Sequence, residues 1–70
     1  MNVSEIQMID PLLTVHEVAA LLRRSVPSVF RGVAKGDLPR PVKLGASSRW
    51  PQSEILAVIE AAKAARGIAE

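Results

Sequence analysis

The sequence predicts a small, mainly α-helical domain made of three helices and one two-stranded β-hairpin. Three segments carry apolar residues at the i, i+3, i+4, i+7 spacing that marks one face of a helix. Prolines and then small residues separate the second of these segments from the third, a pattern typical of a rigid connector followed by a hairpin. A chain of 70 residues, 49% of them hydrophobic, can form only one thin core.

The first helix is predicted to follow a flexible leader over residues 1–11. These residues show no clear period and end in Asp10-Pro11, a typical boundary pair. Thr14 and Glu17 fit a capping box, in which each side chain accepts a hydrogen bond from a free amide at the helix start. We expect this helix to end near residue 22 or 23, with an apolar stripe of Val15, Val18, Ala19 and Leu22.

The second helix is predicted to begin near Val26 and to stop at Gly36. Ser25 can cap its free amides, and Pro27 falls in the first turn, where a missing N–H costs nothing. At Arg23 related turns often have Gly, so we expect a turn that is slightly longer or differently bent. The apolar stripe that we expect to face the core consists of Val26, Val29, Phe30 and Val33.

A hairpin is predicted between the second and third helices. The segment 38–41 contains Pro39 and Pro41, which force their predecessors into extended conformations, and it forms the connector. Residues 42–44 and 49–50 are the expected strands, and the small residues 45–48 between them are the expected loop.

The third helix is predicted to follow Pro51 and to stop at Gly67, with Glu54 in its first turn and basic residues in its last. Its apolar arc is expected to cover the core together with Trp50, although it also offers a surface for a second protomer. The arc consists of Ile55, Leu56, Val58, Ile59 and Ala62. The domain is thus expected over residues 12–67, followed by a tail over 68–70.

The charges are segregated along the chain. The net charge is only +2, but residues 23–49 contain seven Lys and Arg against one acidic residue, a net charge of +6. This density favours a polyanionic partner.

Several classes of function are unexpected. The chain has no Cys, His16 is its only His, and no Gly-rich phosphate loop is present. We therefore expect a protein that is not an enzyme and that has no cofactor, no metal and no small-molecule substrate. No apolar run reaches the ~18 residues needed to span a bilayer, and the first residues lack the basic start of a signal peptide. We expect a cytoplasmic protein with no membrane partner.

Two short helices joined by a tight turn, the second of them basic, match the helix-turn-helix that fits the major groove of DNA. In this interpretation the second helix reads base edges, and Arg31 can form a paired hydrogen bond to guanine or instead hold a phosphate. The hairpin forms a basic projection that suits the adjacent minor groove or the backbone. The expected DNA-binding residues are Ser25, Pro27, Ser28, Arg31 and Lys35 on the helix, Arg40 on the connector, and Lys43, Ser47, Ser48 and Arg49 on the hairpin.

The segments LLTVHEVAALL, SVPSVFRGVAKGDLPRPVKLG and RWPQSEI together resemble the AlpA-type phage regulators and related excisionases, which have a MerR-like winged helix-turn-helix domain. The resemblance covers about residues 12–60. It implies a nucleoid-associated DNA-binding protein of a prophage or mobile element, acting as a transcriptional regulator or as an excisionase that steers an integrase towards excision. It also implies protomers that bind in arrays on adjacent sites.

Two alternatives compete with this interpretation. A small adaptor or antitoxin can use the same basic strip to bind an acidic protein. A single-stranded nucleic-acid binder stacks bases on exposed aromatic side chains. Phe30 and Trp50 both fall on expected core positions, which favours duplex DNA.

Overall fold

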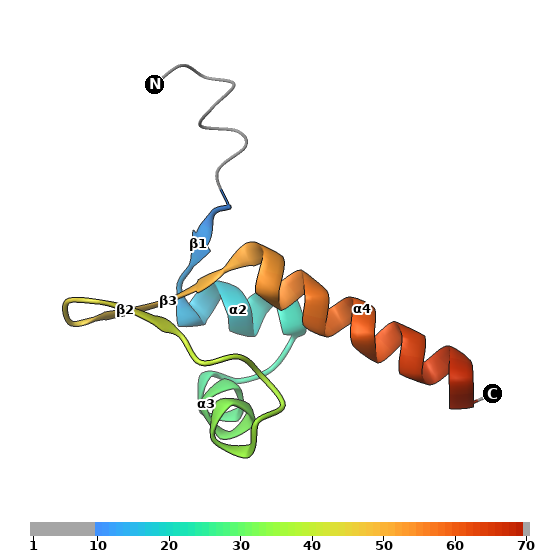
Figure 1. The fold of residues 1–70 in the computed structure, drawn as a ribbon. Coiled ribbons are helices and arrows are strands. Elements are labelled where there is room, and N and C mark those ends of the chain that lie inside the picture. The colour runs from blue at the N-terminus through green and yellow to red at the C-terminus, as the bar shows by residue number, and fades with distance from the viewer. Residues whose placement is uncertain (1–9, 70) are drawn as a thin grey trace.

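The computed structural model describes residues 10–69, except for the side chains of residues 67–69, and shows a winged helix-turn-helix (Figure 1). The three predicted helices and the hairpin are present, and a third strand completes an antiparallel sheet. In chain order the elements are β1 (Leu12–Leu13), α2 (Val15–Leu22), α3 (Val26–Lys35), β2 (Val42–Leu44), β3 (Ser47–Pro51) and α4 (Gln52–Ala69).

The sheet has the order β1-β3-β2. In β1, which the sequence did not predict, Leu13 pairs with Trp50. On the other edge of β3 the register pairs Val42 with Arg49 and Lys43 with Ser48. The hairpin loop is shorter than predicted, because Ser47 and Ser48 belong to β3 and only two residues form the turn. Gly45 occupies one of them with φ 64°, a conformation that glycine adopts without steric cost.

The core contains residues from each helix and from the sheet. Its six buried hydrophobic residues are Val18, Ala19, Val29, Leu38, Trp50 and Ile55. Trp50 is fully buried, as predicted, and its indole Nε1 donates a 2.9 Å hydrogen bond to the carbonyl oxygen of Pro39. This bond satisfies the polar atom of the largest core side chain and ties the connector to β3.

Phe30 is not a core residue, contrary to the prediction, because 46% of its surface is exposed. The position that faces the core instead is Gly32, which is buried. Leu38, from the connector, packs where a side chain at Gly32 would lie: a Cβ built there would come 2.9 Å from Leu38 Cδ1. The second helix is therefore turned so that Phe30 lies at the edge of its outward face.

The predicted helix caps of α2 and α3 are confirmed. Thr14 and Glu17 form the reciprocal capping box, with hydrogen bonds of 3.1 and 2.8 Å. Gly36 ends α3 in the left-handed conformation at φ 88°. Arg23 ends α2 at φ 55° and ψ 45°, so the turn before α3 keeps three residues and was wrongly expected to be longer or differently bent.

Residues 10 and 11 hold the start of α4 and were wrongly assigned to the leader, whose residues 1–9 lie outside the described residues. Asp10 accepts hydrogen bonds from both the amide and the hydroxyl of Ser53, and the carbonyl oxygen of Pro11 accepts one from the amide of Gln52. The hydroxyl of Ser53, and after it the backbone amide of Ser53, holds the pKa of Asp10 below its ordinary value.

The helix α4 leaves the body of the domain and extends away from it (Figure 1). Gly67 was expected to stop it, but the helix runs on to residue 69, through part of the predicted tail. Only the N-terminal part of its apolar arc is covered: Ile55 is buried, Val58 and Ile59 are half-buried, and Leu56 and Ala62 are exposed. Within residues 10–69, no helix is long and apolar enough to cross a membrane.

Candidate nucleic-acid interface

The helix pair α2 and α3 forms the centre of the candidate site. Val18 and Ala19 of α2 and Val29 of α3 belong to one buried cluster, which fixes the two helices relative to each other. Between the helices, the backbone amide of Arg23 donates to the last turn of α2, and the amide of Arg24 donates to the carbonyl oxygen of Ala19 at 2.9 Å. The start of α3 is thus held rigidly against α2.

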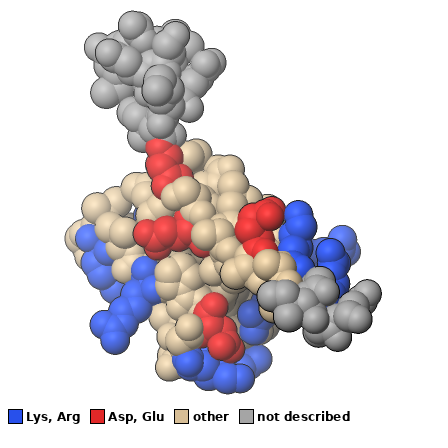
Figure 2. Space-filling view, turned by 45° about the vertical axis from the view of Figure 1, so that its right-hand side comes forward, with Lys and Arg blue, Asp and Glu red and all other residues tan. Residues whose placement is uncertain are grey.

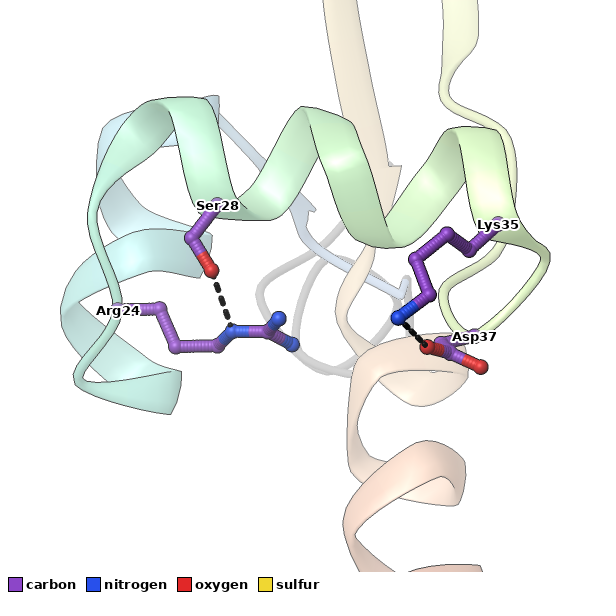
Figure 3. A network of polar contacts seen from close by, with 4 residues as sticks. All are labelled: Arg24, Ser28, Lys35 and Asp37. Carbon is purple, nitrogen blue, oxygen red and sulfur yellow. Dashed lines mark hydrogen bonds and ion pairs between the residues drawn. The ribbon is translucent and has the colours of Figure 1, made fainter.

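Two hydroxyl groups and a guanidinium lie together at the N-terminus of α3, and Figure 3 shows two of the three residues, Arg24 and Ser28. The hydroxyl of Ser25 caps the helix by accepting a 3.2 Å hydrogen bond from the amide of Ser28. The hydroxyl of Ser28 accepts a 2.9 Å hydrogen bond from Nε of Arg24. Since each hydroxyl still has a proton to donate, both can bind an anionic oxygen at the positive end of the helix dipole.

Arg24 was not among the predicted site residues. Its side chain lies along α3, and its Nη1 comes 3.7 Å from the position that a Cβ on Gly32 would occupy. The spacing of four residues between Arg24 and Ser28 is a signal in the sequence, but it crosses the boundary between the turn and the helix. Arg24 therefore adds a positive charge to the two serines, Ser25 and Ser28, that were predicted to bind DNA at the N-terminus of α3.

The outward face of α3 carries both polar and apolar side chains. Arg31 is exposed and makes no hydrogen bond or ion pair with any described residue. Lys35 lies one turn further along and forms an exposed ion pair with Asp37 at 3.9 Å (Figure 3). Such a pair contributes little stability in water, so Lys35 can exchange Asp37 for a phosphate oxygen. Pro27, Phe30 and Ala34 are the exposed apolar residues of the same face.

The predicted hairpin residues do not project together from one surface. Residues that pair across antiparallel strands share a face, so Lys43 and Ser48 lie on the face of Trp50, whereas Ser47 and Arg49 lie on the opposite face. The ammonium of Lys43 donates a 2.8 Å hydrogen bond to the hydroxyl of Ser48. Nη1 of Arg49 donates to the carbonyl oxygen of Ser48 at 2.9 Å, and this side chain is half-buried.

Two further features belong to the hairpin region. Arg40 is exposed on the connector that leads into β2. Val42 and Leu44 are 41% and 52% exposed and share the face of Arg49, so this ribbon carries a basic residue on each face but exposes large apolar residues on only one.

The hairpin and α3 are joined through their aromatic residues. The rings of Phe30 and Trp50 have centroids 6.2 Å apart and an interplanar angle of 55°. The base of the hairpin is thus fixed beside α3, and two basic elements of the chain are held in one orientation.

Charge is unevenly distributed over the surface. In Figure 2, Lys and Arg lie around the left, lower and right margins of the visible face, whereas Asp and Glu lie nearer its centre and its top. The lower margin is at the height of α3 in Figure 1. The face in view therefore does not suit a polyanion at its centre, because its basic side chains lie at its margins.

Comparison with known proteins identifies the same region. A family model described as a helix-turn-helix domain matches residues 12–63, from β1 to the middle of α4. No curated protein and no solved structure matches the chain significantly.

Proposed function

The chain belongs to a family of helix-turn-helix domains, and on this basis we propose that it binds specific sites on double-stranded DNA. In this proposal it serves a prophage or mobile element as an excisionase, as a transcriptional regulator, or as both. The resemblance of segments such as LLTVHEVAALL and RWPQSEI to AlpA-type regulators and excisionases supports this finer assignment. We further propose that it acts by binding alone, without catalysis or a cofactor, on the DNA of the nucleoid in the cytoplasm.

The observation that carries the proposal is the outward face of α3. Arg31 projects from this face without a partner among the described residues, one turn from a helix start that carries Ser25, Ser28 and Arg24. Hydroxyls, free amides and a guanidinium at a helix start suit phosphate oxygens, which set the register of a protein on DNA. With the register so fixed, Arg31 is in place to donate two hydrogen bonds to O6 and N7 of a guanine in the major groove.

The hairpin supplies the second contact in this proposal. A thin ribbon with Lys43 on one face and Arg49 on the other suits a minor groove, because the phosphates that border the groove lie on both sides of an inserted element. Arg40 and Lys35 extend the positive surface between the hairpin and α3. These contacts add affinity without reading sequence.

Self-association on adjacent sites forms part of the proposal, because one small domain contacts too few base pairs for high affinity alone. The exposed part of the apolar arc on α4 offers a surface for a neighbouring protomer or for an integrase. It borders an open groove of about 340 Å³ between α2 and α4, lined by Leu22, Val58, Ile59, Ala62, Lys63 and Arg66.

A mobility-shift titration of the full chain tests the proposal. The duplex fragments come from its own genomic neighbourhood, and the titration is run with random competitor DNA at two salt concentrations. We expect discrete shifts that resist the competitor and weaken with salt. A ladder of shifts supports an array of protomers, whereas a single shift supports one protomer or dimer per site.

The matched control is a pair of variants that remove one positive charge each. Arg31→Ala removes it from α3, and Lys63→Ala removes it from α4, where Lys63 is paired with Glu60 at 3.2 Å. Because Lys63 also lines the groove offered to a neighbouring protomer, the two variants are compared on the first shifted band only. We expect Arg31→Ala to lower resistance to competitor and Lys63→Ala to leave it unchanged. Binding of the wild type that never exceeds binding to random DNA would instead favour an adaptor or antitoxin that uses the basic strip on an acidic protein.

A further inference from the structure

Phe30 is a large apolar side chain on the outward face of α3, where the proposed function places DNA. At about 100° per residue, Phe30 and Arg31 flank the centre of that face, which Pro27 and Ala34 occupy. With 46% of its surface exposed, Phe30 leaves much of an aromatic ring in water. An exposed aromatic ring beside the centre of a binding element indicates a contact rather than a packing role.

The ring of Phe30 is held in one place. It packs against Trp50 at a centroid distance of 6.2 Å, and Trp50 is fully buried and anchored by its hydrogen bond to Pro39. A side chain fixed in this way loses little conformational entropy when a ligand covers it. Phe30 therefore presents a preformed apolar surface on the same outward face of α3 as Arg31.

We propose that Phe30 packs against the C5-methyl group of a thymine next to the base pair that Arg31 contacts, and so gives the protein a second specificity-determining residue. The inference rests on the proposed function, because it needs α3 in the major groove. There the methyl group of thymine is the one apolar feature of the base edges, and an aromatic side chain is a suitable partner for it.

Stacking of an unpaired base on Phe30 is the competing chemistry. Proteins that bind single strands use several exposed aromatic side chains in a row. This chain has one Phe, one Trp and no Tyr, and the Trp is fully buried, so Phe30 has no second aromatic platform beside it. The ring of Phe30, which packs at an angle on the buried Trp50, therefore suits the edge of a base pair in a duplex better than the face of an unpaired base.

The experiment replaces thymines by deoxyuridines, which lack only the methyl group. The preferred duplex is first selected from random DNA with the full wild-type chain, and each thymine is then replaced singly. At one position we expect an about fourfold loss of wild-type affinity, which corresponds to about 0.8 kcal/mol for one methyl group. Phe30→Ala is expected to bind the two duplexes equally, whereas Phe30→Leu and Arg31→Ala keep the preference for thymine.

The outcomes separate this inference from the proposed function. Failure to select any duplex, or tighter binding to the single strand, overturns both. A selected duplex that the wild type binds equally at every deoxyuridine position overturns the role of Phe30 and leaves the proposed function intact. This readout uses the wild type alone, so it holds even if Phe30→Ala fails to fold in a circular-dichroism control.

Discussion

Arg23→Gly is expected to stabilise the domain. Arg23 has φ 55° and ψ 45°, the left-handed region in which an L-residue is strained by roughly 1–2 kcal/mol. Glycine removes that strain but raises the entropy of the unfolded chain, which costs about 0.4–1 kcal/mol. The difference predicts a gain of about 0.5–1 kcal/mol in the free energy of unfolding. For a domain of this size, that gain corresponds to a rise of about 2–8 °C in Tm.

Thermal and urea unfolding, followed by circular dichroism, measure this gain. Arg23→Ala is the matched control, because alanine loses the same charge and every side-chain atom beyond Cβ but keeps the Cβ that causes the strain. The glycine variant must therefore be more stable than both the wild type and the alanine variant. If the glycine variant is no more stable than the alanine variant, the strain of positive φ at this turn does not exceed the entropic cost of glycine, about 0.4–1 kcal/mol, and the reasoning is wrong.

Three further variants test the site and the fold. Arg31→Ala is expected to cost ~1–3 kcal/mol on the preferred duplex and to relax selection at one base position; an equal loss on every sequence would make Arg31 a phosphate contact. Lys43→Ala is expected to weaken all duplexes alike and to lower the slope of log K against log salt by ~1, as measured by titration at several salt concentrations. Asp10→Asn is expected to be less stable than the wild type at pH 7, with a difference that shrinks as acid protonates Asp10. The lowered pKa of Asp10 gives stability that is present above its ordinary value of 3.8 and is lost as the pH falls below that value, so a difference constant with pH would contradict the hydrogen bond to Ser53.

The local signals in the sequence predicted most of the fold. The helix starts and stops depend on residues only a few positions apart, so their effect can be derived without knowing the rest of the chain. They are Thr14 with Glu17 and Ser25 with Pro27, which suit the free backbone amides at a helix start, and Gly36, which ends a helix. The basic residues were also assigned correctly to α3 and to the hairpin, because charge density does not depend on packing, while their contact with DNA stays a prediction. Their division between two hairpin faces follows from the strand register, which the short strands did not reveal.

The features that sequence reasoning missed depend on partners far along the chain. The strand β1 has two residues, too few to show a period, and it forms because Leu13 pairs with Trp50 of β3. Asp10 caps α4 across 43 residues, a distance over which no capping pattern can be recognised. The isolated Gly67 was predicted to end α4, but an exposed helix tolerates one glycine at a cost of only ~1 kcal/mol.

The error at Phe30 has a physical cause that also explains how the candidate site is oriented. Gly32 has no side chain and therefore counts as neutral in a hydrophobic pattern, although Leu38 of the connector packs directly against it. Leu38 fills the space that Gly32 leaves, and the amide of Leu38 donates a 3.1 Å hydrogen bond to the carbonyl oxygen of Gly32. This contact turns the Gly32 side of α3 inward, and the same rotation carries Phe30 and Arg31 to the outward face. A glycine in the middle of the helix, together with the buried Val29, thus faces the core and leaves Phe30 and Arg31 on the side available to bind DNA.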